Sequence, residues 1–189
     1  MNMLSREAIE MLGFASVGNN AQISDRASFY GANRIALGNN VRIDDFCVLS
    51  AGVGGILIGD YVHIAVGSSL IGAGNITMSD FSGLASHVAI YSSSDDYSGS
   101  TLTNPTVPSE YTNVTHADVF LGKHVIVGSG SVILPGITLE EGVAVGALSL
   151  VQKQCKAFGI YAGNPARRIK ERKRDLLELE RQFMANKTQ

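Results

Sequence analysis

The sequence has few features of a membrane, secreted or metal-binding protein. No segment contains 18 consecutive apolar residues, and the N-terminal MNMLSREAIEML lacks the basic flank and long apolar stretch of a signal peptide. The two cysteines, Cys47 and Cys155, form no Cys-x-x-Cys or Cys/His spacing, which argues against a zinc motif or a disulfide framework. We therefore expect a cytosolic protein with reduced thiols and without an integral membrane segment.

The chain also lacks a large excess of charge of one sign. The formal net charge is −2, which does not favour a general nucleic-acid-binding protein. Eight of the fifteen Lys and Arg residues nevertheless lie in 167–187, so this basic cluster needs its own explanation. A length of 189 residues with 45% hydrophobic residues suits a single globular domain.

A six-residue period dominates the sequence. The hexapeptides LGKHVI, VGSGSV, ILPGIT, LEEGVA and VGALSL follow one another without a gap over 121–150. The same phase occurs in six sets of three aliphatic or aromatic residues: Val17, Ile23, Phe29; Leu37, Ile43, Leu49; Ile58, Ile64, Leu70; Met78, Leu84, Ile90; Leu121, Val127, Ile133; and Leu139, Val145, Val151. This pattern predicts an all-β solenoid of triangular cross-section, in which each inward side chain stacks on its equivalent one coil away.

Three segments depart from the hexapeptide phase. Residues 1–16 predict a short helical cap with Ser5 as N-cap, and residues 166–189 predict a C-terminal helix from about Ala166 to Met184. The solenoid would then occupy 17–165. Within it, residues 91–118 form an extended loop too long to lack a role, which makes this loop a functional candidate.

The run VFLGKHVIVGSGSVILPGITLEEGVAVGALSLVQK, followed by IYAGNPARRIK, resembles the hexapeptide-repeat acyltransferases, and most of all their galactoside and maltose acetyltransferase branch. The resemblance covers roughly residues 17–170. It implies a left-handed parallel β-helix of about six coils, a homotrimer with active sites between subunits, and acetyl-CoA as acyl donor.

The resemblance also implies which residues contact the donor. Ser129 and Ala147 would line the pantetheine groove, with Gln152 and Lys153 beyond them, and Arg167 and Lys170 would contact the phosphates. Cations at the edge of a groove bind phosphates with little geometric demand. The basic cluster that follows GNPA is thereby explained.

The acceptor side departs from the family pattern. The family's histidine base corresponds to Asp95, and a family asparagine corresponds to Ala65. His63 lies two positions before Ala65, so both point to the same side of a strand. A histidine side chain suits general-base catalysis near neutral pH better than an aspartate does. We therefore predict His63 as the catalytic base.

The sequence SSSDDYSGS offers two readings of Asp95 and Asp96. They can orient the His63 ring or bind substrate, by the logic of a catalytic triad. Alternatively, they belong to an Asx and Ser turn and are solvated. His63 and Asp95 point from different faces of a coil, so a functional pair would require two neighbouring subunits.

The other histidines suggest no metal site. His87 and His124 occupy turn positions and are expected at the surface, while His116 closes the long loop. The spacing of the four histidines lacks the close pair found in zinc-dependent carbonic anhydrases with this kind of solenoid. We expect no metal cofactor.

Two enzymatic functions and one other function remain. The favoured one is acetyl-CoA-dependent O-acetylation of a sugar hydroxyl, in surface polysaccharide or glycoside modification. The alternative is N-acetylation of a nucleotide-linked amino sugar, for which loss of the family histidine matters less because an amine supplies its own lone pair. A non-catalytic trimeric scaffold is the third, but the donor motifs ILPG and GNPAR argue against it.

Overall fold

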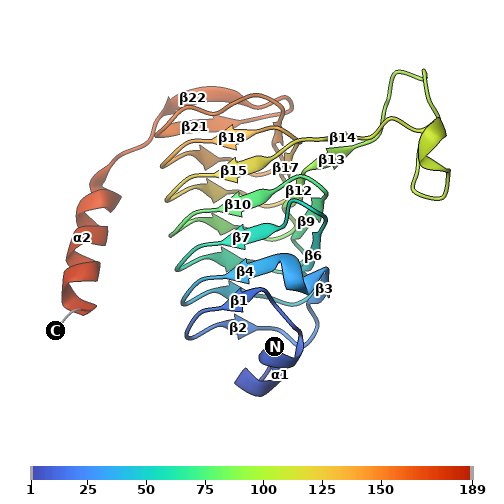
Figure 1. Cartoon of the computed structure of the whole chain (residues 1–189). Helices are drawn as coiled ribbons and strands as arrows, with labels where there is room; N and C mark the ends of the chain where they lie inside the picture. Colours follow the sequence, from blue (N-terminus) through green and yellow to red (C-terminus); the bar gives the residue numbers. More distant parts are fainter. Residues whose placement is uncertain (1, 188–189) are drawn as a thin grey trace.

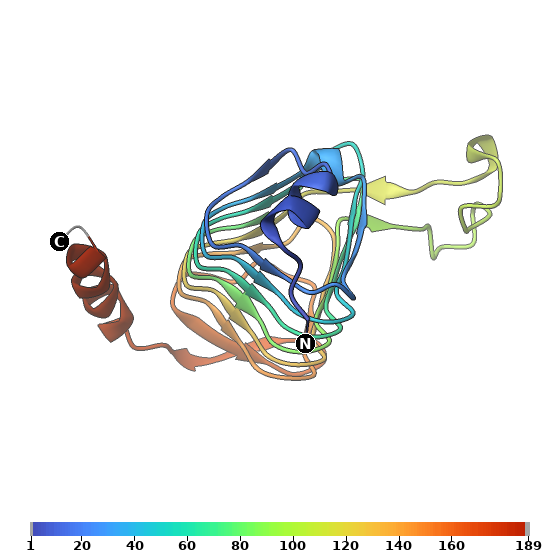
Figure 2. The same cartoon turned by 90° about the horizontal axis from the view of Figure 1, so that it is seen from below.

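The structure, a computed structural model that describes residues 2–187, is a parallel β-solenoid (Figure 1). Each coil contributes one strand to each of three sheets, and the coils superimpose as a rounded triangle when seen from one end (Figure 2). The described residues form six full coils and a seventh strand in one sheet. This architecture is consistent with the predicted left-handed β-helix.

The three parallel sheets have the following strands. Sheet one contains β1 (Ser16–Val17), β4 (Ile35–Leu37), β7 (Ile56–Ile58), β10 (Ile76–Met78), β15 (Val119–Leu121) and β18 (Thr138–Leu139). Sheet two contains β2 (Gln22–Ile23), β5 (Arg42–Ile43), β8 (His63–Ile64), β11 (Gly83–Leu84), β16 (Ile126–Val127), β19 (Ala144–Val145) and β21 (Gly159–Ala162). Sheet three contains β3 (Ser28–Tyr30), β6 (Val48–Ala51), β9 (Ser69–Gly72), β12 (Ala89–Tyr91), β17 (Val132–Ile133) and β20 (Leu150–Val151).

The core is built from the predicted hexapeptide positions. In sheet two, Ile43 pairs in register with Ile64, and Ile64 with Leu84, and all three are at most 2% exposed. Equivalent rows run through the other two sheets. Since burying an aliphatic side chain contributes roughly 1.5–3 kcal/mol, these rows supply most of the force that holds one coil on the next.

One corner, between sheets one and two, carries aromatic side chains on a left-handed backbone. Tyr61, Phe81 and His124 have φ of 57°, 57° and 60°. This conformation costs about 1–2 kcal/mol for a residue with a Cβ. The rings stack outside the backbone, with centroids 4.9 Å apart for Tyr61 and Phe81 and 5.3 Å for Phe81 and His124, which offsets part of that cost. His124, predicted at the surface, is therefore only 9% exposed.

The N-terminal helix α1 (Arg6–Met11) covers the first coil. The Ser5 hydroxyl accepts a hydrogen bond from the Ala8 amide at 3.2 Å, which confirms the predicted N-cap. Ile9 packs into the core with 1% exposure. α1 thus closes the apolar interior at this end of the solenoid.

The long loop leaves the corner between sheets three and one and forms a protruding arm (Figures 1 and 2). Its base is an antiparallel pair, β13 (Ser93–Ser94) with β14 (Thr115–His116), and it contains a 3-10 helix, η2 (Ser109–Tyr111). A second 3-10 helix, η1 (Ala32–Arg34), lies at the same corner of the first coils. The solenoid resumes after the arm, where β15 pairs with β10 in the parallel register that is continuous with the earlier coils.

The predicted C-terminal helix is wrong in its first part. Residues Arg167–Glu171 form a strand, β22, antiparallel to β21, and the helix α2 begins only at Asp175 and ends at Lys187. The last coil of a solenoid leaves an unpaired strand edge, and β22 satisfies that edge. The Arg172 side chain then donates hydrogen bonds to the carbonyls of His124 at 2.7 Å and Gly142 at 3.1 Å, which anchors the chain before α2.

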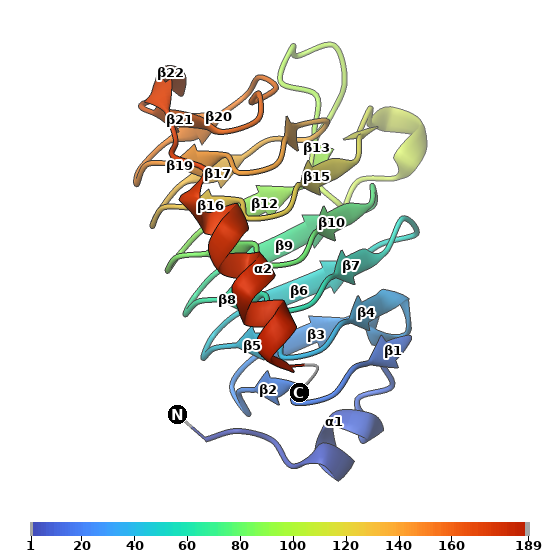
Figure 3. The same cartoon turned by 90° about the vertical axis from the view of Figure 1, so that its left-hand side faces the viewer.

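Helix α2 runs along the aromatic corner toward the N-terminal coils (Figure 3). Phe183 meets Tyr61 edge-on with ring centroids 5.3 Å apart, and Glu180 pairs with both Lys123 and His124, at 2.8 Å in the second case. Among the described residues, no helix is long and apolar enough to cross a membrane. The Glu180 carboxylate and the Phe183 ring thus both attach α2 to the solenoid.

Acid is expected to release α2. Burial acts to raise the pKa of Glu180, but hydrogen bonds from Lys123 and His124 outweigh it and the pKa is lowered. Because the folded-state pKa lies below the unfolded one, docking is stabilised above the ordinary glutamate pKa and weakens as the pH falls through the lowered value. Hydrogen exchange of 175–187 should thus accelerate relative to the core at about pH 3, below the ordinary carboxylate range, and in Glu180→Gln at neutral pH.

The matched control is Glu178→Gln. Glu178 pairs only within the helix in the contacts described, with Arg181 at 2.6 Å and Gln182 at 3.1 Å. Its replacement should leave the exchange of α2 close to that of the wild type. Equal protection of α2 in the Glu180→Gln protein would show that the carboxylate does not hold the helix.

Candidate active site

The outer face of sheet two changes in character along the solenoid. Its outward side chains are in register from coil to coil: Gln22, Arg42, His63, Gly83, Ile126, Ala144 and Ile160. The first three are polar or charged and the last three are apolar, with Gly83 between the two groups. The face therefore combines a polar half with an apolar half, separated by a position without a side chain.

A pocket of about 660 Å³ lies at this change of character. His63 and Ala65 line it together, as the alternation of side chains predicted, and Gly83, Ser86 and Ser129 line it as well. The lining also includes Tyr61, Phe81, His124, Ile126, Arg172 and Leu176. The strap that leads into α2 thus forms one side of the pocket.

His63 is held by a carboxylate from the preceding coil. Its Nε2 lies 2.8 Å from Oδ2 of Asp44, and Oδ1 of Asp44 accepts a hydrogen bond from Nε of Arg42 at 2.7 Å. Asp44 is 6% exposed, whereas half of the His63 side chain is accessible. The ring therefore has one nitrogen engaged within the chain and an exposed surface in the pocket.

The carboxyl group of Asp44 stays ionised at neutral pH. Burial acts to raise its pKa, but the hydrogen bonds from Arg42 and His63 and the positive charge beside it outweigh burial, so that the pKa is lowered. The unit of Arg42, Asp44 and His63 consequently combines a fixed cation and a fixed anion with one imidazole.

The two aspartates of the arm have different surroundings. Asp96 closes a turn: its carboxylate accepts hydrogen bonds from the Ser98 amide at 2.8 Å, the Ser98 hydroxyl at 2.9 Å and Thr101 at 3.0 Å. The hydrogen bonds from Ser98, first that of its amide, lower the pKa of Asp96. Asp95 instead lines a groove of about 670 Å³ with Tyr91 and Tyr97. The turn reading of the sequence thus describes Asp96 but not Asp95.

Within one chain, Asp95 and His63 line different pockets. The groove of Asp95 crosses the outer face of sheet three, where it is also lined by Val132, Leu134 and Leu150. The pocket of His63 lies on sheet two. A single chain does not bring the two together, so their pairing across subunits stays a prediction.

The predicted donor contacts do not gather at one place. Gln152, Lys153 and Arg167 line one groove of about 220 Å³ at the C-terminal end of the solenoid, together with Tyr161 and Arg168. Ser129 lies instead in the His63 pocket. Ala147 is exposed one coil beyond Gly128, where a Cβ on the glycine would come within 2.5 Å of the Ala147 amide.

Lys170 lies apart from this groove. Lys170 lies in β22, where it pairs with Ile160 of β21. The sequence suggested Lys170 as the second cation beside Arg167, but Arg168 lines the groove there instead. The cationic edge of the groove therefore consists of Lys153, Arg167 and Arg168, of which Arg168 also pairs with Glu171.

The remaining histidines do not form a metal site. His87 is exposed at a corner, as predicted, and His116 is exposed on the arm, where Nδ1 lies 2.8 Å from the Ser93 hydroxyl. Residues 2–187 contain no group of three or more His, Cys, Asp or Glu side chains that could hold a metal ion.

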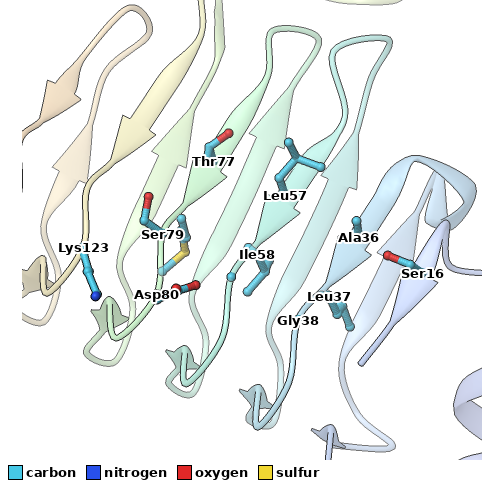
Figure 4. Close-up of a pocket in the computed structure, with 12 residues that line it drawn as sticks. Ser16, Ala36, Leu37, Gly38, Leu57, Ile58, Thr77, Ser79, Asp80 and Lys123 are labelled. Carbon is cyan, nitrogen blue, oxygen red and sulfur yellow. The ribbon is translucent and has the colours of Figure 1, made fainter. Parts of the chain in front are cut away.

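A further groove, of about 460 Å³, crosses the outer face of sheet one (Figure 4). Its lining is mostly apolar or small, and its charged lining residues in the described chain are Asp80 and Lys123. Both are used structurally, because Asp80 accepts the Asp60 amide at 2.8 Å and Lys123 pairs with Glu180. This groove offers no free acid or base, and the His63 pocket is the stronger candidate.

Sequence reasoning missed three residues of the candidate site. Asp44 and Ser86 lie on other coils than His63, and Arg172 belongs to the strap before α2. The coil period carries a signal for Asp44. Arg42 lies 21 positions before His63 and is its register partner, and Asp44 follows Arg42 by two positions. The period of the inward residues, extended to the polar residues beside them, places Asp44 next to His63.

Comparison with known proteins agrees with this fold. No family model matches the chain. The chain is 56% identical to dTDP-4-amino-4,6-dideoxy-D-glucose acyltransferase of Escherichia coli over 183 residues, 97% of this chain and 95% of that protein. Galactoside O-acetyltransferase of Escherichia coli is 28% identical over 88% of this chain and 68% of that protein.

A solved structure of an N-acyltransferase is also similar to this chain, in fold and in sequence. AntD is an N-acyltransferase from Bacillus cereus, and a variant in which alanine replaces a serine was crystallised with dTDP-4-amino-4,6-dideoxyglucose and coenzyme A. That structure matches this chain with a TM-score of 0.95 and 46% sequence identity. The match covers 98% of this chain and 100% of that one. The chain therefore belongs to the hexapeptide-repeat acyltransferases, which confirms the predicted family, and it is an acyltransferase. It is more similar to the amino-sugar N-acyltransferases than to the galactoside branch.

The cationic groove provides a test of donor binding. If Arg167 holds donor phosphates, Arg167→Ala should raise the KM for acyl-CoA about tenfold with a smaller change in kcat, because such contacts exist before and during transfer. Steady-state kinetics with varied acyl-CoA measures both constants. Lys173→Ala, which removes an exposed cation outside the groove, is the matched control. A fall in kcat alone for Arg167→Ala would contradict a phosphate contact.

Proposed function

We propose that this chain transfers an acyl group from acyl-coenzyme A to the 4-amino group of dTDP-4-amino-4,6-dideoxyglucose or a closely related nucleotide-linked amino sugar. The observation that carries the proposal is the 56% identity, over nearly the whole chain, to an acyltransferase named for that sugar. Similarity to AntD, crystallised with the same sugar and coenzyme A, supports it. The amino-sugar alternative thus fits better than the O-acetylation that the sequence analysis favoured.

The chemistry suits the polar half of the sheet-two face. The amine attacks the thioester carbonyl, the C–N bond forms, the C–S bond breaks, and the attacking nitrogen must lose one proton while the sulfur gains one. A neutral amine needs no deprotonation before attack, so a base acts on the nitrogen as or after the bond forms. We assign this proton transfer to His63, the accessible imidazole of the pocket.

Ser86 and the arm complete the proposed acceptor site. Some crystallised AntD variants replace a serine and others replace an aspartate, and these two residues lie ten positions apart in the AntD sequence. Ser86, in the His63 pocket, and Asp96, on the arm, have the same separation here. Asp95 and Asp96 of a neighbouring subunit would then serve as ligands of the amino sugar.

The proposal requires a homotrimer, with the arm of one subunit reaching the sheet-two face of the next. The arm supports this because several of its large apolar side chains are more than half exposed: Tyr97, Leu102 and Tyr111. Exposed apolar residues gathered on one projection are typical of an interface. The cytosolic location predicted from the sequence also stays part of the proposal.

The acyl group need not be acetyl. AntD was also crystallised with 3-hydroxybutyryl-CoA. In this chain Gly83 and Ala65 line the pocket with little or no side chain, and a Cβ built on Gly83 would make only ordinary contacts, with Ile126 at 3.7 Å. We propose an acyl-CoA donor, of which acetyl-CoA is the smallest member to test.

A matched set of acceptors tests the function. Purified protein is given acetyl-CoA or 3-hydroxybutyryl-CoA with dTDP-4-amino-4,6-dideoxyglucose, dTDP-glucose or a simple galactoside, and release of the CoA thiol is followed. We expect turnover with the amine and at least 10²-fold less with the hydroxyls, because only the amine carries a ready nucleophilic lone pair. Turnover with the galactoside alone would return the assignment to O-acetylation.

Subunit mixing tests the composite site. His63→Ala and Asp95→Asn should each form trimers by light scattering and each lose activity, by roughly 10²–10⁴ for the loss of the base. Refolding the two together should restore part of the activity, because a mixed trimer contains an interface with both wild-type residues. A stable monomer in light scattering, or no recovery from a proven mixed trimer, would refute the intersubunit site.

A further inference from the structure

The contact between His63 and Asp44 fixes which ring nitrogen is available to substrate. Oδ1 of Asp44 is occupied by Nε of Arg42 at 2.7 Å, and Oδ2 lies 2.8 Å from Nε2 of His63. An ionised carboxylate only accepts hydrogen bonds, so Nε2 must carry the hydrogen. In a neutral imidazole the other nitrogen, Nδ1, then has the lone pair.

The setting of Asp44 is unusual for a carboxylate with a purely structural role. It is 6% exposed, on a face where most outward side chains are accessible, and removing a charge from water is costly unless it is paired. Arg42, two residues earlier at the start of β5, provides the pairing, and the lowered pKa keeps the carboxylate ionised. An asparagine would fill the same space at a lower cost in solvation. Its amide, however, could present either an acceptor or a donor to the ring.

We propose that Asp44 is a positioning residue for acyl transfer, which holds His63 as the Nε2–H tautomer so that Nδ1 accepts the proton released by the attacking amine. The proton leaves the nitrogen as the C–N bond forms and passes from the imidazolium to the sulfur of the departing CoA, which restores the neutral ring. This inference rests on the proposed function. It places the orienting carboxylate on the coil before His63, in the same chain, where the sequence suggested Asp95 or Asp96.

The variant Asp44→Asn tests the role because it keeps the size and removes the obligatory acceptor. We expect kcat to fall by roughly 10²-fold, within the range of general-base effects, while the KM for acyl-CoA stays within about twofold. Nitrogen-15 NMR of the histidine rings should show Nε2–H for His63 in the wild type and loss of that tautomer in the variant. When a carboxylate orients a catalytic histidine, replacing it by an amide leaves the ring in the wrong tautomer and lowers kcat strongly.

Asp45→Asn is the matched control. Asp45 is the next residue in sequence, but its carboxylate contacts Ser24 and Arg26, not the His63 ring. This variant should keep both the tautomer and kcat. Asp44→Glu, which retains the carboxylate, should recover part of the activity lost in Asp44→Asn.

The outcomes separate this inference from the proposed function. Wild-type kcat in Asp44→Asn, in an enzyme that acylates the amino sugar, would overturn the role of Asp44 and leave the function intact. A His63 ring protonated at Nδ1 in the wild-type protein would overturn it whether or not the variant folds. If no amino sugar is acylated, the proposed function fails, while the NMR signal still decides the tautomer.

Discussion

The structure depends on the stacking of each inward aliphatic side chain on its equivalent in the next coil. Ile43, Ile64 and Leu84 illustrate this row, with in-register parallel pairing and almost no exposure. A shift of one residue would turn the aliphatic side chains outward, so burial fixes the register of every strand. The positions of the outward side chains follow from that same register and need no interaction of their own.

This constraint builds the candidate site from residues that are distant in sequence. Arg42, His63, Gly83 and Ile126 stand in one line on sheet two because the residues that follow them are buried. The same coil-to-coil step brings Asp44 beside the His63 ring. Since the backbone beneath is a paired sheet, the distances between these side chains are set by the solenoid and not by a mobile loop. Such preorganisation is what a proton transfer requires.

Much of the fold could be predicted from the sequence, because a six-residue period follows directly from the burial of one face. All six predicted sets of inward residues pair in register. His63 and Ala65 were correctly placed on one side of a strand. The strand β22 could not be predicted, because its conformation comes from the unpaired edge of β21 and not from its own residues. Nor could the aromatic corner, where ring stacking compensates a left-handed backbone at Tyr61 and Phe81.

The proposed function is acylation of an amine at the polar half of this face. The most direct measurement is the nature of the bond formed on dTDP-4-amino-4,6-dideoxyglucose, identified by mass spectrometry and two-dimensional NMR before and after treatment with hydroxylamine. We expect one acyl group, attached through an amide at the 4-amino nitrogen and resistant to hydroxylamine. An acyl group on a ring hydroxyl, cleaved by hydroxylamine, would contradict it.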